Sequence, residues 1–319
     1  MSSEVEASLT IQSKRVRDSS VRAGLAYSLG MTEREYRGRI APSPTGFLHL
    51  GHAMTFWHAQ QRAREAGGKL VLRIEDLDRD RCRKEFVEAI SEDLHWFGLD
   101  WDEGPDIGGP FAPYVQSERR RYYLEAWEKL RVGGFVYPCK CSRKDVMQAS
   151  LAPHEESEEP IYPGTCRSRS SVVQAAASTT THWRFRVPDD ERIDFVDERV
   201  GKQSAVAGRD FGDFIIWRRD DVQAYQLAVV VDDAAMRISE VVRGEDLLMS
   251  TFRQLLLYRA LDLRPPKFYH APLVLDEFGQ RLAKRHGALS LRALRERGVS
   301  PEEIRLSSRA KSRDPAAKA

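Results

Sequence analysis

The sequence predicts an α/β protein in which helices cross over between the strands of a parallel sheet. Apolar runs of strand length alternate with segments of helical period over residues 36–138, which is typical of strands joined by crossover helices. The 319 residues, 41% of them hydrophobic, also suffice for two domains with a sizeable core. The longest uninterrupted apolar run, Leu227–Val231, has five residues and is too short to cross a membrane.

Order is expected to begin at Tyr36, because residues 1–35 are polar and lack a clear period, as a disordered extension does. Pro42 and Pro44 end the first strand, and Gly67-Gly68 closes the first helix. The predicted elements are, in chain order, a strand at Arg39–Ala41, a helix from Gly51 to Glu65, a strand at Lys69–Ile74, a helix with Phe86, Ile90, Leu94 and Phe97 on one face, a helix marked by Tyr123, Trp127 and Leu130, and a strand at Phe135–Pro138.

The next segment, Cys139–Arg169, differs in composition. It holds three of the four cysteines and an acidic run that begins at His154, so we expect an inserted subdomain tied by a metal and then a linker up to residue 181. Regular structure then resumes with strands at His182–Val187, Arg192–Phe195 and Phe214–Arg218, similar segments at Tyr225–Val231 and Ile238–Val242, a helix at Thr251–Ala260, a hairpin at Pro272–Leu282, and, after a basic loop, a helix near Leu289–Arg297.

Charge is distributed unevenly along the chain. The formal net charge is +2, but residues 281–319 carry a net +7, which leaves −5 for residues 1–280. A basic end of this kind is typical of a surface that contacts a polyanion, and equally of a solvated tail. The first residues lack the apolar stretch of a secretory signal, and four cysteines do not make a disulfide scaffold. A cytoplasmic protein is therefore expected.

The segment Ala41–His52 carries the most informative chemistry. Its prolines make a rigid turn that ends a strand and brings His49, Gly51 and His52 to the start of a helix. Helix N-termini attract phosphate, imidazoles can donate hydrogen bonds to a polyphosphate, and glycine leaves room for a flat base. A nucleotide site is predicted. A stiff turn with surface histidines and a His-x-x-His metal pair are the alternatives.

Gly38–His52 resembles the "HIGH" region of class I aminoacyl-tRNA synthetases, in their glutamyl/glutaminyl branch. Other motifs of this branch follow in order, at Arg73–Asp78, Tyr225–Asp233, Val242–Leu247 and Gly279–Arg285, the last resembling the mobile "KMSKS" loop. The resemblance implies ATP-driven activation of glutamate, with Mg²⁺ accompanying ATP. It also implies a Rossmann-type doubly wound catalytic domain with halves at 36–138 and 182–280, a zinc-binding insertion at 139–181, and the loop with a short helical tail at 281–319.

The cysteine spacing predicts a closed zinc site. Cys139, Cys141 and Cys166 supply three thiolates, and a structural site needs a fourth ligand. Chemistry alone leaves His154 or Cys82 as that ligand, and buried cysteines without a metal are the alternative. The pattern Cys-x-Cys…Tyr-x-x-x-Cys resembles that of glutamyl-queuosine tRNA(Asp) synthetases, and this resemblance implies Tyr162. Only 34 residues follow Arg285, so no anticodon-binding domain is expected, as in that subfamily.

The resemblance also assigns roles to residues. His49, His52 and Lys284 would be catalytic and, with Gly51, would contact ATP. Glutamate would contact the residues that match the branch's binding positions: Arg39, Ile40, Ala41, Pro42, Ser43, Glu75, Tyr225 and Arg243. Planar guanidinium groups suit carboxylates, so the two arginines are candidates for the carboxylates and Glu75 for the ammonium, with structural ion pairs as the alternative for each arginine. The loop departs from the pattern at Arg281 and Ala283.

These observations lead to one functional hypothesis and two alternatives. The first is an enzyme that glutamylates the queuosine base at the wobble position of tRNA(Asp). Its partners would be ATP, L-glutamate and that tRNA; neither DNA nor a membrane is expected to bind, and a monomer is expected. The alternatives are a truncated glutamyl-tRNA synthetase that charges tRNA(Glu), and a non-catalytic zinc-containing protein that binds RNA or an amino acid.

Overall fold

The computed structural model describes residues 35–142, 144–146, 161–167, 181–274 and 290–311. The described residues from Tyr36 onward belong to one compact unit. The expected disordered extension at 1–35, the linker up to residue 181 and most of the hairpin at Pro272–Leu282 fall outside the described residues. Among the described helices, none combines the length and the apolar sequence needed to cross a bilayer.

The first part of the unit is the expected strand–helix–strand. β1 (Arg37–Ile40) leads into α2 (Leu50–Glu65) and then β2 (Lys69–Leu72). The strands are parallel, with Arg37 opposite Lys69 and Ile40 opposite Leu72, so both carboxyl ends lie at the same edge. α3 (Lys84–Trp96) follows, and Ile90 and Leu94 on its predicted apolar face are buried in the same core as β1 and α2.

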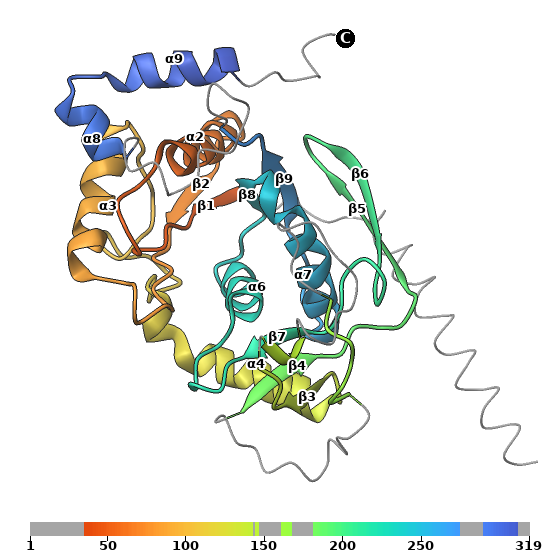
Figure 1. Ribbon diagram of the computed structural model, residues 1–319. Coiled ribbons are helices and arrows are strands. Elements are labelled where there is room, and N and C mark those ends of the chain that lie inside the picture. The colour runs from red at the N-terminus through yellow and green to blue at the C-terminus, as the bar shows by residue number, and fades with distance from the viewer. Residues whose placement is uncertain (1–34, 143, 147–160, 168–180, 275–289, 312–319) are drawn as a thin grey trace, which may run out of the picture. The chain divides into compact units, whose positions relative to one another are not determined.

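Two later strands, in a sheet of their own, lie next to β1. β8 (Glu240–Gly244) and β9 (Lys267–Ala271) are parallel and are joined through a 3₁₀ turn (Glu245–Leu247) and α7 (Leu248–Ala260). The Ser239 N–H donates to the Arg37 carbonyl at 2.9 Å, which places β8 beside β1. Figure 1 shows β2, β1, β8 and β9 side by side. The predicted parallel pairing is therefore present, in the pair β1–β2 and the pair β8–β9, and doubly wound sheets bind ligands at the carboxyl ends of such strands.

Antiparallel pairs complete the strands. β5 (Arg192–Asp197) and β6 (Gly201–Val206) form a hairpin, and β5 also pairs with β9 in a mixed sheet of order β6-β5-β9-β8. β3 (Val136–Cys139), β4 (His182–Phe185) and β7 (Phe214–Trp217) form a separate antiparallel sheet against α4 (Arg120–Val132), which follows a 3₁₀ turn (Gln116–Arg119). The expectation that Phe135–Pro138 joins the parallel sheet is therefore wrong, because β3 pairs antiparallel with β4, with Val136 opposite Phe185.

The segment Tyr225–Val231 is a helix and not a strand. It begins α6 (Tyr225–Ala235), in which every residue from Leu227 to Asp233 is buried. A helix buried on all sides lacks an apolar stripe, and three consecutive valines are typical of a strand. A short apolar run of this kind therefore does not distinguish the two structures.

Two helices lie at the C-terminal end of the described residues. α8 (Leu291–Glu296) matches the predicted terminal helix, and α9 (Pro301–Lys311) was not predicted. A capping box begins α9: the Glu303 N–H donates to Ser300 Oγ at 3.2 Å, and the Ser300 N–H donates to the Glu303 carboxylate at 2.8 Å. Ser-Pro-Glu-Glu is a signature of a helix start, so the sequence did contain this signal.

Candidate functional site

The loop between β1 and α2 presents the predicted histidines at a helix N-terminus. His49 has extended backbone angles (φ −96°, ψ 156°) and directly precedes α2, and His52 lies in its first turn. Their ring centroids are 6.2 Å apart. The loop is held by the C-terminal helices, because the Leu291 N–H donates to the Leu48 carbonyl at 2.8 Å. No side-chain hydrogen bond from His49 caps the start of α2, and free N–H groups at a helix start attract anions.

Gly51 leaves open space beside these histidines. Apart from its chain neighbours and the backbone of its own helix, no heavy atom of the described residues would lie within 4 Å of a Cβ placed on Gly51. The described residues therefore leave space next to the backbone here, and the approach of a flat base stays a prediction. The alternative interpretation is that His49 and His52 bind a metal together. Among the described residues, no third His, Cys, Asp or Glu side chain converges with them, and the one such group of three consists of cysteines.

A second set of predicted residues lies at the carboxyl ends of β1 and β2. The Arg73 N–H donates to the Ile40 carbonyl and the Glu75 N–H to the Pro42 carbonyl, both at 3.0 Å. The loop Ala41–Ser43 therefore runs alongside the chain that follows β2. Arg39 and Glu75 are buried, and Ser43 is exposed.

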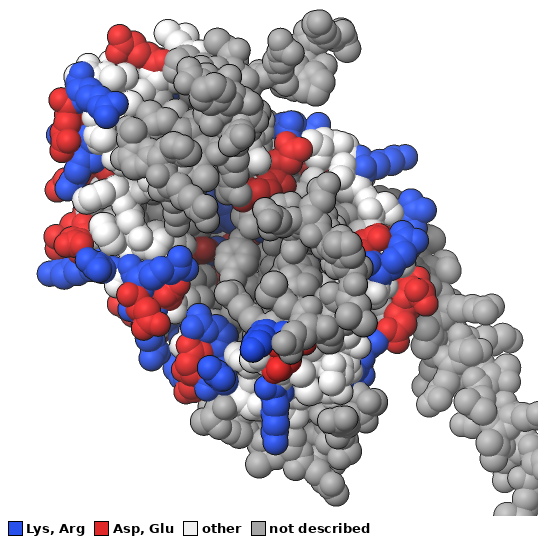
Figure 2. Space-filling model, in the orientation of Figure 1, with Lys and Arg blue, Asp and Glu red and all other residues white. Residues whose placement is uncertain are grey.

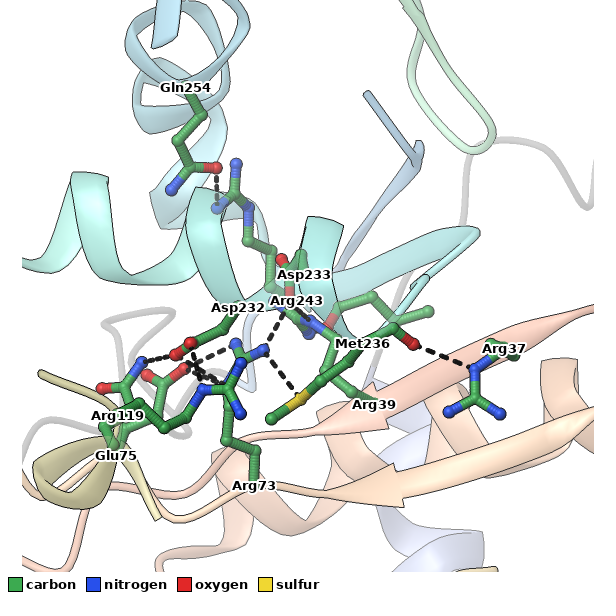
Figure 3. A network of polar contacts seen from close by, with 12 residues as sticks. Arg37, Arg39, Arg73, Glu75, Arg119, Asp232, Asp233, Met236, Arg243 and Gln254 are labelled. Atoms are coloured by element: carbon green, nitrogen blue, oxygen red, sulfur yellow. Dashed lines mark hydrogen bonds and ion pairs between the residues drawn. The ribbon is translucent and has the colours of Figure 1, made fainter. Parts of the chain in front are cut away.

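Arg73 holds this region together (Figure 3). Its guanidinium donates to the Glu75 carboxylate at 2.8 Å and to Asp233 Oδ1 at 2.6 Å, and Asp232 lies 3.9 Å away. Burial alone would lower the pKa of Arg73, but these three carboxylates raise it well above its usual value. Burial raises the pKa of Glu75, with Arg73 acting in the opposite direction. Arg73 thus fixes Glu75 in the pocket through one carboxylate oxygen.

Arg39 shares this cluster but is only partly satisfied. Its Nη1 donates to the Val242 carbonyl at 2.9 Å, and its Nε lies 3.4 Å from Asp233 Oδ1. Within the part of the chain that the structure describes, Arg39 Nε and Asp233 Oδ2 are buried without a hydrogen-bond partner. The structural ion pair considered as an alternative for Arg39 is present, yet it leaves a donor and an acceptor unused.

Arg243 on β8 is held differently, by neutral groups. Its guanidinium donates to His270 Nε2 at 3.2 Å, Gln254 Oε1 at 2.8 Å and Thr251 Oγ1 at 2.6 Å. Among the described residues it has no carboxylate at ion-pair distance, so the ion pair considered as its alternative is not found there. Burial lowers the pKa of Arg243, and the charge of Arg39 lowers it further. Arg243 is therefore a buried cation, only 4% exposed, whose positive charge is left for another group.

Tyr225 faces the same space from the start of α6. Tyr225 is 37% exposed as a whole residue, yet desolvation raises the pKa of its hydroxyl, on which the charges of Arg243, Glu75 and Arg39 also act. The structure therefore brings Arg39, Glu75, Tyr225 and Arg243 together from four separate parts of the sequence. In Figure 2, acidic and basic side chains are interspersed around this face, and charged atoms of both signs are visible in the hollow near its centre.

Several polar residues of the pocket were not given roles from the sequence. They are Arg73, Asp233, Thr251, Gln254 and His270, all buried. Arg73 and Asp233 lie inside motifs that the sequence singled out, whereas the other three have no local signal. The predicted catalytic Lys284 and its neighbours Arg281 and Ala283 lie outside the described residues.

The three predicted cysteines converge at the end of β3. The sulfur atoms of Cys139, Cys141 and Cys166 lie within 4.8 Å of one another. The Tyr162 hydroxyl lies 3.5 Å from the sulfurs of Cys139 and Cys141. Cys82 lies outside this group, and His154 lies outside the described residues.

The spacing of these four groups fits a metal ion. In a tetrahedral zinc site, two sulfurs lie about 3.8 Å apart, and a sulfur and an oxygen about 3.5 Å apart. The Cys141 and Cys166 sulfurs are 3.6 Å apart, and the sulfur–oxygen distances match. Arg184 donates to Cys139 Sγ at 3.3 Å and lies over the Tyr162 ring, so it would offset the negative charge of thiolates. The three cysteines can hold a metal.

Comparison with known proteins gives the family. The model of the tRNA synthetases class I (E and Q), catalytic domain, matches residues 35–309. The chain belongs to this family. The resemblance noted from the sequence is therefore confirmed at the level of the family.

Individual members of the family are similar to this chain over most of its length. The glutamyl-Q tRNA(Asp) synthetase of Symbiobacterium thermophilum is 51% identical, covering 84% of this chain and 83% of the relative. That of Nitratidesulfovibrio vulgaris is 50% identical with the same coverage. The glutamate–tRNA ligase of Sulfurihydrogenibium sp. is 40% identical, but only 56% of it is covered.

A solved structure of the family supports the same fold. The glutamate tRNA ligase of Elizabethkingia meningosepticum, in complex with its amino acid, has a TM-score of 0.69 and 33% identity, covering 80% of this chain and 53% of that chain. The chain thus spans about half the length of the glutamate–tRNA ligases that it matches.

The buried network predicts a large stability effect for Arg73→Met. The substitution would leave the carboxylates of Glu75 and Asp233 buried without their cation, and breaking a buried pair costs about 3–5 kcal/mol. We expect a clearly lower urea midpoint by circular dichroism, or loss of soluble protein. Arg64→Met, which removes an exposed pair with Asp100, is the control and should change stability by less than about 1 kcal/mol. Equal midpoints for both variants would contradict this account.

Proposed function

We propose that the chain activates L-glutamate with ATP and transfers the glutamyl group to the queuosine base at the wobble position of tRNA(Asp). The relatives named for this activity match along four fifths or more of both chains. The observation that carries the amino-acid part of the proposal is Arg243, a buried cation with neutral partners. A buried guanidinium of this kind needs an anion, and glutamate offers a side-chain carboxylate.

The roles of the pocket residues follow from where the reaction must take place. The α-carboxylate of glutamate has to reach the ATP phosphates at the start of α2. Arg39, which directly precedes that loop, is therefore assigned to the α-carboxylate, and Arg243 on β8 to the side-chain carboxylate. Glu75, with one oxygen held by Arg73, and the unpartnered Oδ2 of Asp233 supply negative charge for the ammonium. Tyr225 offers a hydroxyl, and Ile40 to Ser43 form the adjoining wall.

The reaction needs no protein nucleophile. An oxygen of the α-carboxylate bonds to the α-phosphorus of ATP, the bond from that phosphorus to the bridging oxygen breaks, and pyrophosphate leaves. Catalysis is then positioning and charge stabilisation. His49, His52 and Lys284 would donate hydrogen bonds to the phosphates, and Mg²⁺ enters with ATP. In the second step a hydroxyl of the queuosine base bonds to the acyl carbon and loses its proton to solvent, the bond from that carbon to the phosphate oxygen breaks, and AMP leaves with that oxygen.

We also propose that the cysteine group holds one structural zinc ion. Three thiolates and the Tyr162 hydroxyl form a closed four-ligand set, which leaves no position for a substrate. Zinc would tie the turn that follows β3, where the described residues of the small cluster around Tyr137 and Val146 contribute little apolar core.

Glutamylation assays test the main proposal. Purified protein is incubated with labelled glutamate, ATP, and either queuosine-containing tRNA(Asp), queuosine-free tRNA(Asp) or tRNA(Glu), and the label is mapped by ribonuclease digestion. We expect label only in the anticodon fragment of the queuosine-containing tRNA. Lys284→Ala serves as the control for contaminating synthetases. Label at the 3′ end of tRNA(Glu) would instead support the truncated glutamyl-tRNA synthetase.

ATP–pyrophosphate exchange without tRNA separates the remaining alternative. We expect glutamate-dependent exchange without tRNA, as the resemblance to glutamyl-queuosine tRNA(Asp) synthetases implies, whereas an ordinary tRNA(Glu) enzyme would require its tRNA. A protein that shows neither exchange nor glutamylation would be a non-catalytic binder.

Gly51→Ala is expected to weaken ATP binding without harming the fold. Beyond its own helix and chain neighbours, a Cβ at this position meets no atom of the described residues within 4 Å, and alanine favours a helix by up to about 1 kcal/mol over glycine. The KM for ATP should rise roughly tenfold while the thermal midpoint stays the same or increases. Gly46→Ala, which is equally open, is the matched control. Unchanged ATP kinetics in Gly51→Ala would exclude close approach of the base.

Cys139→Ser is expected to remove the zinc. A serine hydroxyl binds zinc much more weakly than the buried Cys139 thiolate. The zinc content measured by mass spectrometry should therefore fall from one equivalent per chain to near zero. Tyr162→Phe keeps the three thiolates and should lower zinc affinity roughly tenfold or more. Cys82→Ser is the control and should retain the metal. Full occupancy in Cys139→Ser would refute the site.

A further inference from the structure

A buried acid–imidazole pair lies behind Arg243. Asp197 ends β5 and His270 lies on β9, and both side chains are 0% exposed. His270 Nδ1 and Asp197 Oδ2 are 2.6 Å apart, and the N–H groups of Arg199 and Val200 donate to Asp197 Oδ1 at 3.0 Å. Burial alone would raise the pKa of Asp197, but the hydrogen bonds from His270 and these N–H groups lower it to about 2. Asp197 is therefore an oriented anion.

The contacts of His270 determine which of its nitrogens carries the proton. Nε2 lies 3.2 Å from Arg243 Nε, which always bears a hydrogen, and 3.1 Å from Thr251 Oγ1. An Nε2–H group would point its hydrogen at that of Arg243, so Nε2 has to be the acceptor. The proton then sits on Nδ1 and faces Asp197. Asp197 thereby selects the tautomer in which His270 can hold Arg243.

The other contacts of Arg243 are neutral amides and hydroxyls. Gln254 accepts from Arg243 Nη1, donates to Gln226 at 2.9 Å, and Gln226 in turn donates to Ser250 at 3.0 Å. Within the described ranges, the path through His270 is thus the one hydrogen-bonded path from Arg243 to a carboxylate. A carboxylate in direct contact with Arg243 would neutralise its charge, as Glu75 and Asp233 neutralise that of Arg73. An imidazole between Asp197 and Arg243 fixes the guanidinium and leaves its charge available to a ligand.

We propose that Asp197 and His270 are positioning residues that orient Arg243 for the side-chain carboxylate of glutamate. The inference rests on the proposed function, because it takes glutamate as the substrate. Neither residue contacts the substrate in this account. Both act through the plane of the Arg243 guanidinium, and so they affect recognition of glutamate and its discrimination from glutamine.

Asp197→Asn is the central test. The asparagine oxygen can still accept from the backbone N–H groups, and its amide NH₂ then faces His270 Nδ1 and moves the imidazole proton to Nε2. That proton meets the N–H of Arg243 and displaces the guanidinium. In ATP–pyrophosphate exchange we expect the KM for glutamate to rise roughly tenfold or more, with the KM for ATP within about twofold of wild type. The preference for glutamate over glutamine should fall.

Matched variants separate positioning from stability. Glu103→Gln removes a buried carboxylate that pairs with Arg37 at 2.8 Å, so it should lower the thermal midpoint and leave the KM for glutamate unchanged. His270→Gln offers an oxygen to Arg243 and should retain more glutamate affinity than His270→Leu. If Asp197→Asn changes only the thermal midpoint, as Glu103→Gln does, the two residues are merely structural and the inference is wrong.

Histidine NMR tests the tautomer without any substrate. In protein labelled with ¹⁵N-histidine, two-bond proton–nitrogen spectra should show His270 with a protonated Nδ1 and a bare Nε2, the signal being assigned from its loss in His270→Gln. An active wild-type enzyme with the proton on Nε2 would overturn the inference. A wild type with the expected tautomer but without glutamate-dependent exchange would support the relay and contradict the proposed function.

Discussion

The guanidinium of Arg73, fully buried among three carboxylates, is the interaction on which the pocket depends. Arg73 follows β2, whereas Asp232 and Asp233 lie on α6, so this one side chain joins the early and the late parts of the chain at the ends of the strands. Removing such charges from water costs several kcal/mol each, and the cost is offset only while every partner stays in place. The position of α6 relative to β2 is therefore fixed, and with it the positions of Glu75 and Tyr225.

Arg73 and Arg243 show how the same residue type serves two purposes. Both are buried, yet carboxylates raise the pKa of Arg73, whereas burial lowers that of Arg243, whose direct partners are neutral. Carboxylates of the protein itself neutralise the charge of Arg73. The hydrogen-bond partners of Arg243 are neutral and leave its charge uncompensated. A pocket that binds a molecule with two carboxylates and one ammonium needs both kinds of site. Burial and residue type are equal in the two cases, so the identity of the hydrogen-bond partners decides the role.

The sequence predicted most of what local signals encode. The alternation of β1, α2 and β2, the histidine turn and the cysteine group were all visible in spacing and turn residues. α6 was assigned to the wrong structure because a fully buried helix has no amphipathic period, and α9 was missed although the capping box at Ser300 marks its start. The partners of Arg243 could not be found in this way, since His270 is 27 residues away and only the pairing of β8 with β9 brings it close.

The cysteine group and the proposed amino-acid pocket follow one physical rule. In each, the fold gathers polar groups that the described residues do not complete: free thiols beside a phenol in one case, a cation with neutral partners in the other. The buried cation costs free energy until an anion compensates its charge, and the thiols can become thiolates only when a cation compensates theirs. Sequences otherwise satisfy their own buried polar groups, so local exceptions of this kind mark functional sites. The Asp197–His270 pair fits this rule: it satisfies the geometry of Arg243 while leaving its charge to be neutralised by a ligand.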